Sequence, residues 1–196
     1  CGFAMVNIRS LNKHGKHLAR DDIMLQYDII FVTEIWQKTF DIEGYMSAFA
    51  HGTTGKARGV GVFFKQDANI ELCQEELYQF IKFKTEDITI FCLYISKGCD
   101  FGKLVQSLCN YDFNNKDENT FLIGDLNFDA PGNNNLSNYL SRLEFKQMVG
   151  RATHLDGHIL DHVYVPQARS VDIKHHHVYY SDHDGILVSV KKDVAM

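Results

Sequence analysis

Proline is scarce in this chain, with 2 residues among 196. Flexible linkers and disordered tails are normally rich in proline and polar residues, so its scarcity argues against both. No apolar run reaches the ~18 residues of a membrane-spanning helix. A basic stretch followed by an apolar one, which would mark a secretory signal peptide, is also missing. Together with a chain length typical of one domain, these features predict a single packed domain, 1–196, with no membrane span.

The cysteines do not form a pattern that indicates cross-links. There are 5, an odd number, and no pair has the CxxC spacing of many zinc sites. Reduced thiols are the better interpretation, and they indicate an intracellular protein. The chain begins with Cys1 rather than Met and enters an apolar run at once, so we interpret it as a domain of a longer polypeptide.

An excess of basic residues is missing as well. The formal net charge is −5, which argues against a strong, non-specific nucleic-acid binder. It does not exclude a nuclease, because a bound metal ion would offset part of the acidic excess.

Short apolar runs separated by turn-forming residues predict a chain rich in strands. The expected strands span 4–8, 28–34, 59–65, 77–84, 88–95, 120–127, 160–165, 171–178 and 185–190. Helical periodicity predicts helices over 14–26, 101–111 and 136–145. We therefore predict an α+β fold, in which two mostly antiparallel sheets form a sandwich with helices on its outer faces.

Acidic and amide residues stand where the predicted strands begin or end. They are Asn7, Glu34, Asp125, Asn127, Asp161, Asp182 and, beside the last of these, His183. Because strand ends can converge on one rim of a sheet, these residues can share a site. Crowded carboxylates repel one another, and a divalent cation relieves that repulsion. Oxygen ligands suit Mg²⁺, so the pattern predicts a metal-dependent site that cleaves phosphodiesters.

Five short motifs resemble, in their order and rough spacing, the endonuclease/exonuclease/phosphatase superfamily. They are Asn7, Thr33-Glu34, Gly124-Asp125-Leu126-Asn127, Leu160-Asp161-His162 and Ser181-Asp182-His183. Each motif alone is a weak signal, but together they cover nearly the whole chain. The resemblance implies the fold of exonuclease III and DNase I, a four-layer α/β sandwich. The segments 7–11, 32–36 and 152–154 are most similar to endonuclease domains of non-LTR retrotransposons and Helitron-like elements.

The resemblance implies a set of ligands for Mg²⁺ or Mn²⁺. Glu34 would be the principal ligand, with Asn7 beside it. Asp182 would complete the metal environment, directly or through water. Many relatives carry an acid two residues after the first asparagine, whereas this chain has Arg9. Arg9 cannot bind a cation, so the ligand set would be smaller, and Arg9 would contact phosphate instead.

The resemblance also implies roles in the reaction itself. Asp125 would orient or deprotonate the attacking water, and Asn127 would hold the phosphate or the water. His183 would donate to a phosphate oxygen, while Asp161 fixes its tautomer and favours its charged form. Tyr94 matches a tyrosine near the phosphate, although a strand tyrosine is more often a core or rim residue.

Several further residues are candidates for substrate binding. Thr153 and His154 precede the Asp161 motif, with a plain loop as the alternative, and Ser181 either binds substrate or caps the next element. Lys56 and Arg58 lie among glycines, either in a surface loop or against a DNA backbone. The run His175-His176-His177 suggests a metal site, but alternation along a strand separates its members, so solvated histidines are the better interpretation.

These features predict a DNA nickase, monomeric as an isolated domain, from a mobile element whose larger polypeptide carries a reverse transcriptase or helicase. Such an enzyme would act on DNA in the nucleus. The loop 154–160 is short, so little protein could enter a groove and base-specific readout should be modest. Two alternatives stay open: an enzyme of the same fold acting on RNA, a phospholipid or an inositol phosphate, and a binding module without activity. Fold alone cannot choose among them.

Overall fold

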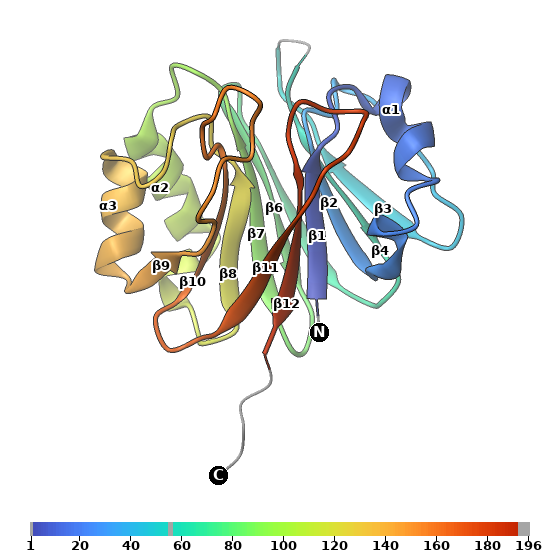
Figure 1. Cartoon of the computed structure of the whole chain (residues 1–196). Coiled ribbons are helices and arrows are strands. Elements are labelled where there is room, and N and C mark those ends of the chain that lie inside the picture. Colours follow the sequence, from blue (N-terminus) through green and yellow to red (C-terminus); the bar gives the residue numbers. More distant parts are fainter. Residues whose placement is uncertain (1, 55–56, 192–196) are drawn as a thin grey trace.

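Two six-stranded sheets pack face to face (Figure 1). They belong to a computed structural model that describes residues 2–54 and 57–191. The first sheet has the order β11-β12-β1-β2-β4-β3, and the second has the order β5-β6-β7-β8-β10-β9. β1 pairs with β2, and β7 with β8, in parallel, while the other named pairs are antiparallel.

The bounds of the strands are as follows. The first sheet contains β1 (Gly2–Asn7), β2 (Ile29–Thr33), β3 (Met46–Ala50), β4 (Val60–Phe64), β11 (Val171–His176) and β12 (Gly185–Val190). The second contains β5 (Asn69–Gln74), β6 (Tyr78–Lys84), β7 (Thr89–Ile95), β8 (Thr120–Asp125), β9 (Phe145–Gln147) and β10 (Asp161–Pro166).

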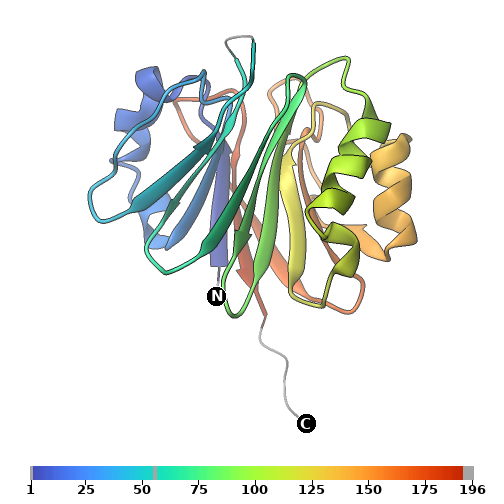
Figure 2. The ribbon, with the colours of Figure 1, turned by 180° about the vertical axis from the view of Figure 1, so that it is seen from behind.

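Helices cover the two outer faces of the sandwich. α1 (Leu11–Leu18) lies on the first sheet, and α2 (Phe101–Asn110) and α3 (Asn135–Arg142) lie side by side on the second (Figures 1 and 2). Short 3₁₀ helices, η1 (Met24–Gln26) and η2 (Phe113–Asn115), complete the elements of the described residues. The layers are therefore helix, sheet, sheet and helices, which confirms the predicted α+β sandwich.

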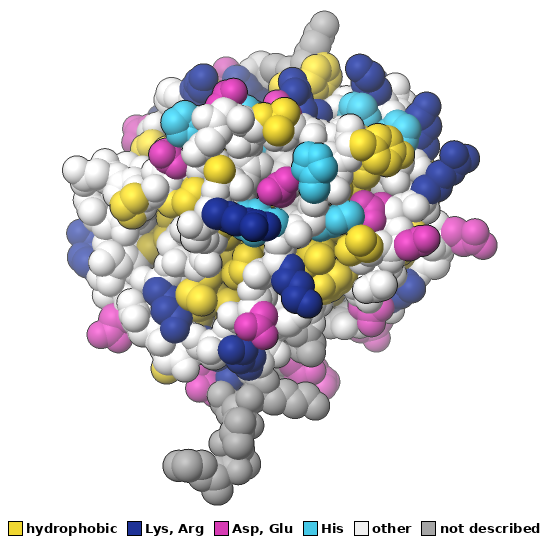
Figure 3. Space-filling model, in the orientation of Figure 1, with side chains coloured by type: hydrophobic (Ala, Val, Ile, Leu, Met, Phe, Trp, Pro, Cys, Tyr) yellow, Lys and Arg dark blue, Asp and Glu magenta, His cyan; other side chains and the backbone are white. Residues whose placement is uncertain are grey.

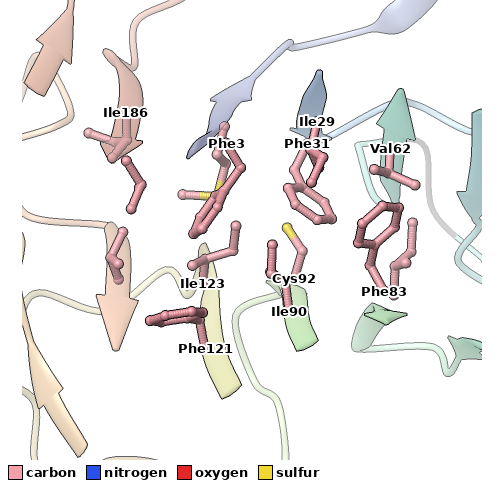
Figure 4. Close-up of a cluster of buried hydrophobic side chains, with 14 of the residues drawn as sticks. Phe3, Ile29, Phe31, Val62, Phe83, Ile90, Cys92, Phe121, Ile123 and Ile186 are labelled. Atoms are coloured by element: carbon pink, nitrogen blue, oxygen red, sulfur yellow. The ribbon is translucent and has the colours of Figure 1, made fainter. Parts of the chain in front are cut away.

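Strand alternation divides the apolar residues among three cores. On β1, Phe3 and Met5 face the opposite sheet, whereas Ala4 and Val6 face the α1 side. The central core lies between the sheets, where Figure 4 shows Phe3 and Ile123 on facing strands. Fully burying such a side chain contributes ~1.5–3 kcal/mol. The central core thus holds the two sheets together and fixes how the strand ends of one sheet lie against those of the other.

The predicted helix 14–26 is wrong in its bounds. α1 begins at Leu11, where the Ser10 hydroxyl accepts from the backbone N–H of Lys13, and it ends at Leu18. A separate turn follows, because Asp21 Oδ1 accepts from the N–H groups of residues 23 and 24. The apolar residue Ile23, which suggested a longer helix, is 44% exposed.

Three strands, β3, β5 and β9, fall outside the predicted ones. β3 has little apolar alternation, and β9 has three residues, so neither gives a strong signal. β5 alternates between exposed and more buried positions only over its first four residues, and the pattern ends at the buried Cys73. Within residues 2–54 and 57–191, every helix is too short or too polar to span a bilayer.

Candidate active site

The polar residues of the predicted motifs meet at one rim of the sandwich. β1, β2 and β8 end there, and β10 and β12 begin there, at the upper edge in Figure 1. Asn7 follows Phe3 and Met5 on the same face of β1, and Asp125 follows Phe121 and Ile123 on β8. The site is therefore the polar end of the central core.

The same alternation places Asp161 and Tyr94. Asp161 shares its face of β10 with Val163 and Val165, and it pairs in register with Asp125. Tyr94 also pairs with Asp125 across β7 and β8. Three neighbouring strands thus hold these side chains at one height, as the sequence predicted.

A glycine allows β7 and β8 to approach closely just before Asp125. Gly124 has φ +149°, and an added Cβ would lie 2.0 Å from the carbonyl oxygen of Leu93. A larger residue cannot adopt this close pairing without moving one of the strands. The backbone at this point therefore fixes where the Asp125 carboxylate stands.

Asn7 connects two carboxylates at the centre of the site. Its Nδ2 donates to Glu34 Oε2, and also to Asp125 Oδ2 at 2.8 Å. Its Oδ1 accepts from the backbone N–H of Arg9 at 3.1 Å. Glu34 adopts φ +52°, a conformation that non-glycine residues rarely take and that clusters at functional sites.

A buried histidine and aspartate form a pair beside Asp125. His183 Nδ1 lies 2.7 Å from Asp161 Oδ2, and His183 Nε2 lies 4.0 Å from Asp125 Oδ2. The hydroxyl of Thr153 accepts from the backbone N–H groups of residues 160 and 161, and so positions the start of β10. The Nε2 atom of His183 is therefore turned toward the carboxylate site, with its tautomer set by Asp161.

The site holds protons more tightly than ordinary carboxylates do. Burial raises the pKa of Glu34. Burial, with repulsion from Asp161, raises the pKa of Asp125 to about 8. Burial alone would lower the pKa of His183, but the charge of Asp161 and the hydrogen bond to it raise that pKa to about 9. Without a cation, ionising all of these carboxyl groups at neutral pH is unfavourable.

These residues fit a hard divalent cation. Ligand atoms of Glu34, Asp125 and His183 lie within 4.8 Å of one another, and Asn7 can offer Oδ1 if its amide turns over. The oxygen donors among them suit Mg²⁺ or Mn²⁺, whereas His183, whose raised pKa keeps its ring charged at neutral pH, can only donate hydrogen bonds. A cation would favour the ionised carboxylates, which explains why two buried acids are kept together here.

Asp182 lies at the edge of this set rather than at its centre. Its Oδ2 accepts from Arg9 Nη1 at 2.8 Å and lies 3.1 Å from His154 Nε2. Its Oδ1 lies 3.9 Å from His183 Nε2 and has no hydrogen-bond partner among the described residues. One oxygen of Asp182 is thus held by two basic groups, and the other is available beside His183. Ligation by Asp182 stays a prediction.

Arg9 and His154 contact the acid that the resemblance assigns to the metal. Arg9 is half exposed, so its guanidinium can face a substrate while one nitrogen holds Asp182. The rings of His154 and His183 stand edge to face, with their centroids 4.8 Å apart. Figure 3 shows histidines gathered on the upper half of this face, with acidic side chains between them.

Asn127, Tyr94 and Ser181 complete the site. Asn127 has φ +52°, and its Nδ2 donates to the carbonyl of Ile95 at 2.6 Å. Burial, together with the charge of Glu34, raises the pKa of the Tyr94 phenol. The hydroxyl of Ser181 accepts from the N–H of His183 at 3.1 Å, which fixes the loop that carries the histidine.

Arg58 is held by backbone groups of two loops. The guanidinium of Arg58 donates to the carbonyl oxygens of Thr54 and Glu76, at 2.9 and 2.6 Å, and so ties two loops together. Lys56 lies outside the described residues. For both residues, contact with substrate stays a prediction.

The interpretation of His175 to His177 as solvated histidines is wrong for two of the three. His175 lies 3.1 Å from Asp184, with 7% of its side chain exposed, and His176 lies 2.9 Å from Asp21, with 15% exposed. His177 is largely exposed and also contacts Asp184. Alternation does separate them as predicted, since His176 binds a different carboxylate from its two neighbours.

No protein-family model and no curated protein matches the sequence. Solved structures do match it over nearly its whole length. The endonuclease domain of TRAS1, a telomere-specific non-LTR retrotransposon, superposes with a TM-score of 0.72 at 13% identity, covering 97% of each chain. An AP endonuclease from Archaeoglobus fulgidus superposes with a TM-score of 0.69 at 16% identity, covering 98% of this chain and 99% of that one.

A 3′-5′ exonuclease, NExo from Neisseria meningitidis, also matches, with a TM-score of 0.69 at 16% identity, covering 98% of this chain and 100% of that one. The chain has the endonuclease/exonuclease/phosphatase fold. At these identities the likeness shows this fold, and the relatives include an endonuclease and an exonuclease. The fold therefore does not choose a reaction, which depends on the residues at the rim.

The predictions from sequence missed the residues that border the site beside α1. Trp36 and Tyr179 line a cavity of about 430 Å³ together with Arg9, Lys13, His14 and Asp182. Their positions in the sequence gave a signal that could have been used. Trp36, the single tryptophan, comes two residues after Glu34, and Tyr179 comes shortly before Ser181-Asp182-His183.

Proposed function

We propose that this protein is a divalent-metal-dependent DNA endonuclease that nicks duplex DNA. The observation that carries the proposal is the assembly at one rim of Glu34, Asn7, Asp125 and the His183–Asp161 pair. Their ligand and hydrogen-bonding atoms lie within a few ångströms of one another and are largely buried. A binding module without activity has no need to bury and pair ionisable groups in this way.

Each residue has a distinct task in hydrolysis. Asp125, which a bound cation would keep ionised, accepts the proton of the attacking water. His183, charged through Asp161, donates a hydrogen bond to a non-bridging oxygen of the phosphate. Asn127 holds the phosphate or the water. When bound by Glu34 and Asn7, Mg²⁺ would neutralise the phosphate and favour ionisation of water.

DNA is the substrate that the fold and the motifs together favour. The TRAS1 structure is that of a retrotransposon endonuclease domain, and a NExo structure holds a product DNA hairpin. We therefore propose that the chain serves a mobile element as its nuclease domain, linked to a reverse transcriptase or helicase and acting in the nucleus. RNA, phospholipid and inositol phosphate substrates are the alternatives.

Supercoiled plasmid tests this function directly. We expect wild-type protein to convert it to the open-circular form with Mg²⁺ or Mn²⁺, and not with EDTA. Replacing Glu34 by alanine or glutamine removes a negative ligand, so the nicking rate should fall at least about a hundredfold. Glu86→Ala is a suitable control, because Glu86 is exposed in the loop after β6, at the opposite end of the sheets.

Two results would contradict the proposal. Nicking by Glu34→Ala at the wild-type rate in limiting Mg²⁺ would show that the metal is held elsewhere. If wild-type protein leaves plasmid intact but cleaves RNA or an inositol phosphate, the proposed hydrolysis is retained but DNA is the wrong substrate.

A further inference from the structure

The cavity between α1 and the loop before β12 adjoins the active site but holds none of its central carboxylates. We name it the Trp36–Tyr179 pocket. Its volume is about 430 Å³, within the ~300–1,000 Å³ common for ligand sites. It shares Arg9 and Asp182 with the active site, and Asp182 in turn lies against His183. A molecule bound at the carboxylates can therefore extend into this pocket.

Tyr179 presents an exposed aromatic ring in a fixed orientation. The residue is 78% exposed, although a ring of this size is usually buried. Its hydroxyl lies 2.8 Å from His17 Nδ1 on α1, and its ring stands edge-on to those of His17 and Tyr180. The contacts hold the ring still while its surface stays available, so little entropy is lost when a planar ligand stacks on it.

Trp36 is held on the other side of the pocket by a strained backbone. Trp36 and Gln37 have φ +57° and +55°, in the left-handed region, and the N–H of Trp36 donates to the carbonyl of Arg58 at 3.1 Å. The indole Nε1 is buried without a hydrogen-bond partner among the described residues. Strain of this kind persists where function requires the side chain to be placed.

The chemistry of the lining selects a class of ligand. Arg9 and Lys13 add positive charge, which the carboxylate of Asp182 offsets in part, while Trp36 and Tyr179 add aromatic surface. None of the lining residues is Leu, Ile, Val or Met, which an acyl chain would require. Cations beside aromatic rings are the combination that binds the phosphates and bases of a single strand.

We infer that the Trp36–Tyr179 pocket binds an unpaired nucleobase of the strand being cut, next to the scissile phosphate. Arg9 and Lys13 contact the neighbouring phosphate, and the base stacks on the aromatic rings. This inference rests on the proposed function and deepens it. The preferred substrate is a strand that is unpaired or locally opened at the nick, because a paired base cannot enter a pocket.

The single tryptophan allows a binding test that needs no catalysis. Wild-type protein in EDTA is titrated with a ten-residue oligothymidylate while Trp36 fluorescence is followed. The reference ligand is an oligomer of the same length and charge in which every base is replaced by hydrogen. We expect oligothymidylate to quench Trp36 and to bind about tenfold more tightly than the reference, as stacking of one base implies.

Substitutions at Tyr179 then assign the preference to the pocket. Tyr179→Ala should bind both oligomers with nearly equal affinity, while Tyr179→Phe, which keeps the ring, should retain most of the preference. Met46→Ala is the control, because Met46 is 47% exposed on β3 and does not line the pocket. Circular dichroism confirms that each variant is folded.

The two proposals fail in different ways. Equal binding of both oligomers by the wild-type protein, or a full preference in Tyr179→Ala, overturns the base pocket even if plasmid is nicked. If wild-type protein does not nick plasmid, the proposed function is contradicted. The preference for oligothymidylate is measured by fluorescence without a metal, so it supports or overturns the pocket independently.

Discussion

At the scale of single residues, Asn7 shows how the site tolerates its own charge. A buried amide donates to two carboxylates at once, which lowers the cost of keeping them together but does not remove it. The raised pKa values of Glu34 and Asp125 reflect the remaining cost of ionising these carboxyl groups. A bound cation would offset this remaining electrostatic cost, so metal binding and protein stability are linked at this site.

The first prediction concerns Asp125→Asn in metal-free protein. Since the pKa of Asp125 is raised to about 8, its ionisation destabilises the fold increasingly as the pH rises from the unfolded value near 4 through 8. The asparagine variant lacks this penalty and keeps the bond from Asn7. It should therefore melt at higher temperature than wild type in EDTA above pH 7, although it loses activity. Scanning calorimetry from pH 4 to 9 measures the difference, and a wild-type protein that is more stable than the variant at pH 8.5 contradicts it.

The second prediction concerns the His183–Asp161 pair. Removing either side chain should lower the nicking rate by a similar large factor, and the double variant should lose little more, because the two act as a unit. Single-turnover rates of His183→Ala, Asp161→Asn and the double variant test this. Multiplicative losses would show that the two residues work independently.

The same pair predicts a pH dependence of stability. The folded pKa of His183, about 9, lies above its unfolded value near 6.5. The stabilisation is therefore fully present below pH 6.5 and is lost as the pH rises through 9. Urea unfolding should show that the difference in the free energy of unfolding between wild type and Asp161→Asn becomes smaller as the pH rises from 6.5 through 9.

The sequence predicted which residues share the site and that Asp161 would hold His183, but it did not predict the contact between Arg9 and Asp182. Strand alternation and motif order placed Asn7, Asp125 and Asp161 on one rim, and the structure brings them there. The sequence could not show that Arg9 would hold Asp182, because that contact joins residues 173 positions apart and depends on a loop conformation. The sequence placed Tyr179 shortly before Ser181-Asp182-His183, but it could not show that the ring would be exposed, since exposure is a property of the packed molecule.

At the scale of elements, the parallel pairing of β7 and β8 decides where the Asp125 carboxylate lies. β8 carries Asp125 at its end, β7 carries Tyr94 opposite, and Gly124 lets the backbones approach. Element bounds were predictable where apolar alternation is continuous, as at β12. They were wrong where a side chain interrupts the backbone pattern, as Asp21 does after α1.

The third prediction is that Gly124→Ala destabilises the fold strongly. An added methyl would lie 2.0 Å from the Leu93 carbonyl oxygen, so a buried strand has to move. We expect a loss of about 3 kcal/mol or more in the free energy of unfolding. Gly150→Ala is the matched control, because nothing lies within 4 Å of its added methyl, and it should change stability by about 0.5 kcal/mol or less. Urea unfolding of both variants measures this, and equal stabilities would show that the sheet accommodates the methyl group.

At the scale of the whole molecule, the distribution of charge limits how strongly the protein would bind DNA under the proposed function. The chain carries 20 Lys and Arg against 25 Asp and Glu, and several basic groups near the site are already paired, as Arg9 is with Asp182. Few phosphates can therefore be neutralised at once, so affinity should be modest at physiological salt and should depend only weakly on salt concentration.

The last prediction is that the enzyme nicks many sites. The segment 154–160 forms a tight turn, in which the N–H of Gly157 donates to the carbonyl of His154, and Leu155 is 73% exposed on it. One such side chain cannot read several base edges, so DNA deformability should set the preference, with flexible pyrimidine–purine steps cut most often. Replacing Arg9 or Arg58 by glutamine should slow nicking at all sites alike, because phosphate contacts carry no sequence information. Sequencing of nick positions across a few kilobases measures the pattern. A single dominant sequence that survives changes in its flanking DNA would show that the domain reads bases directly.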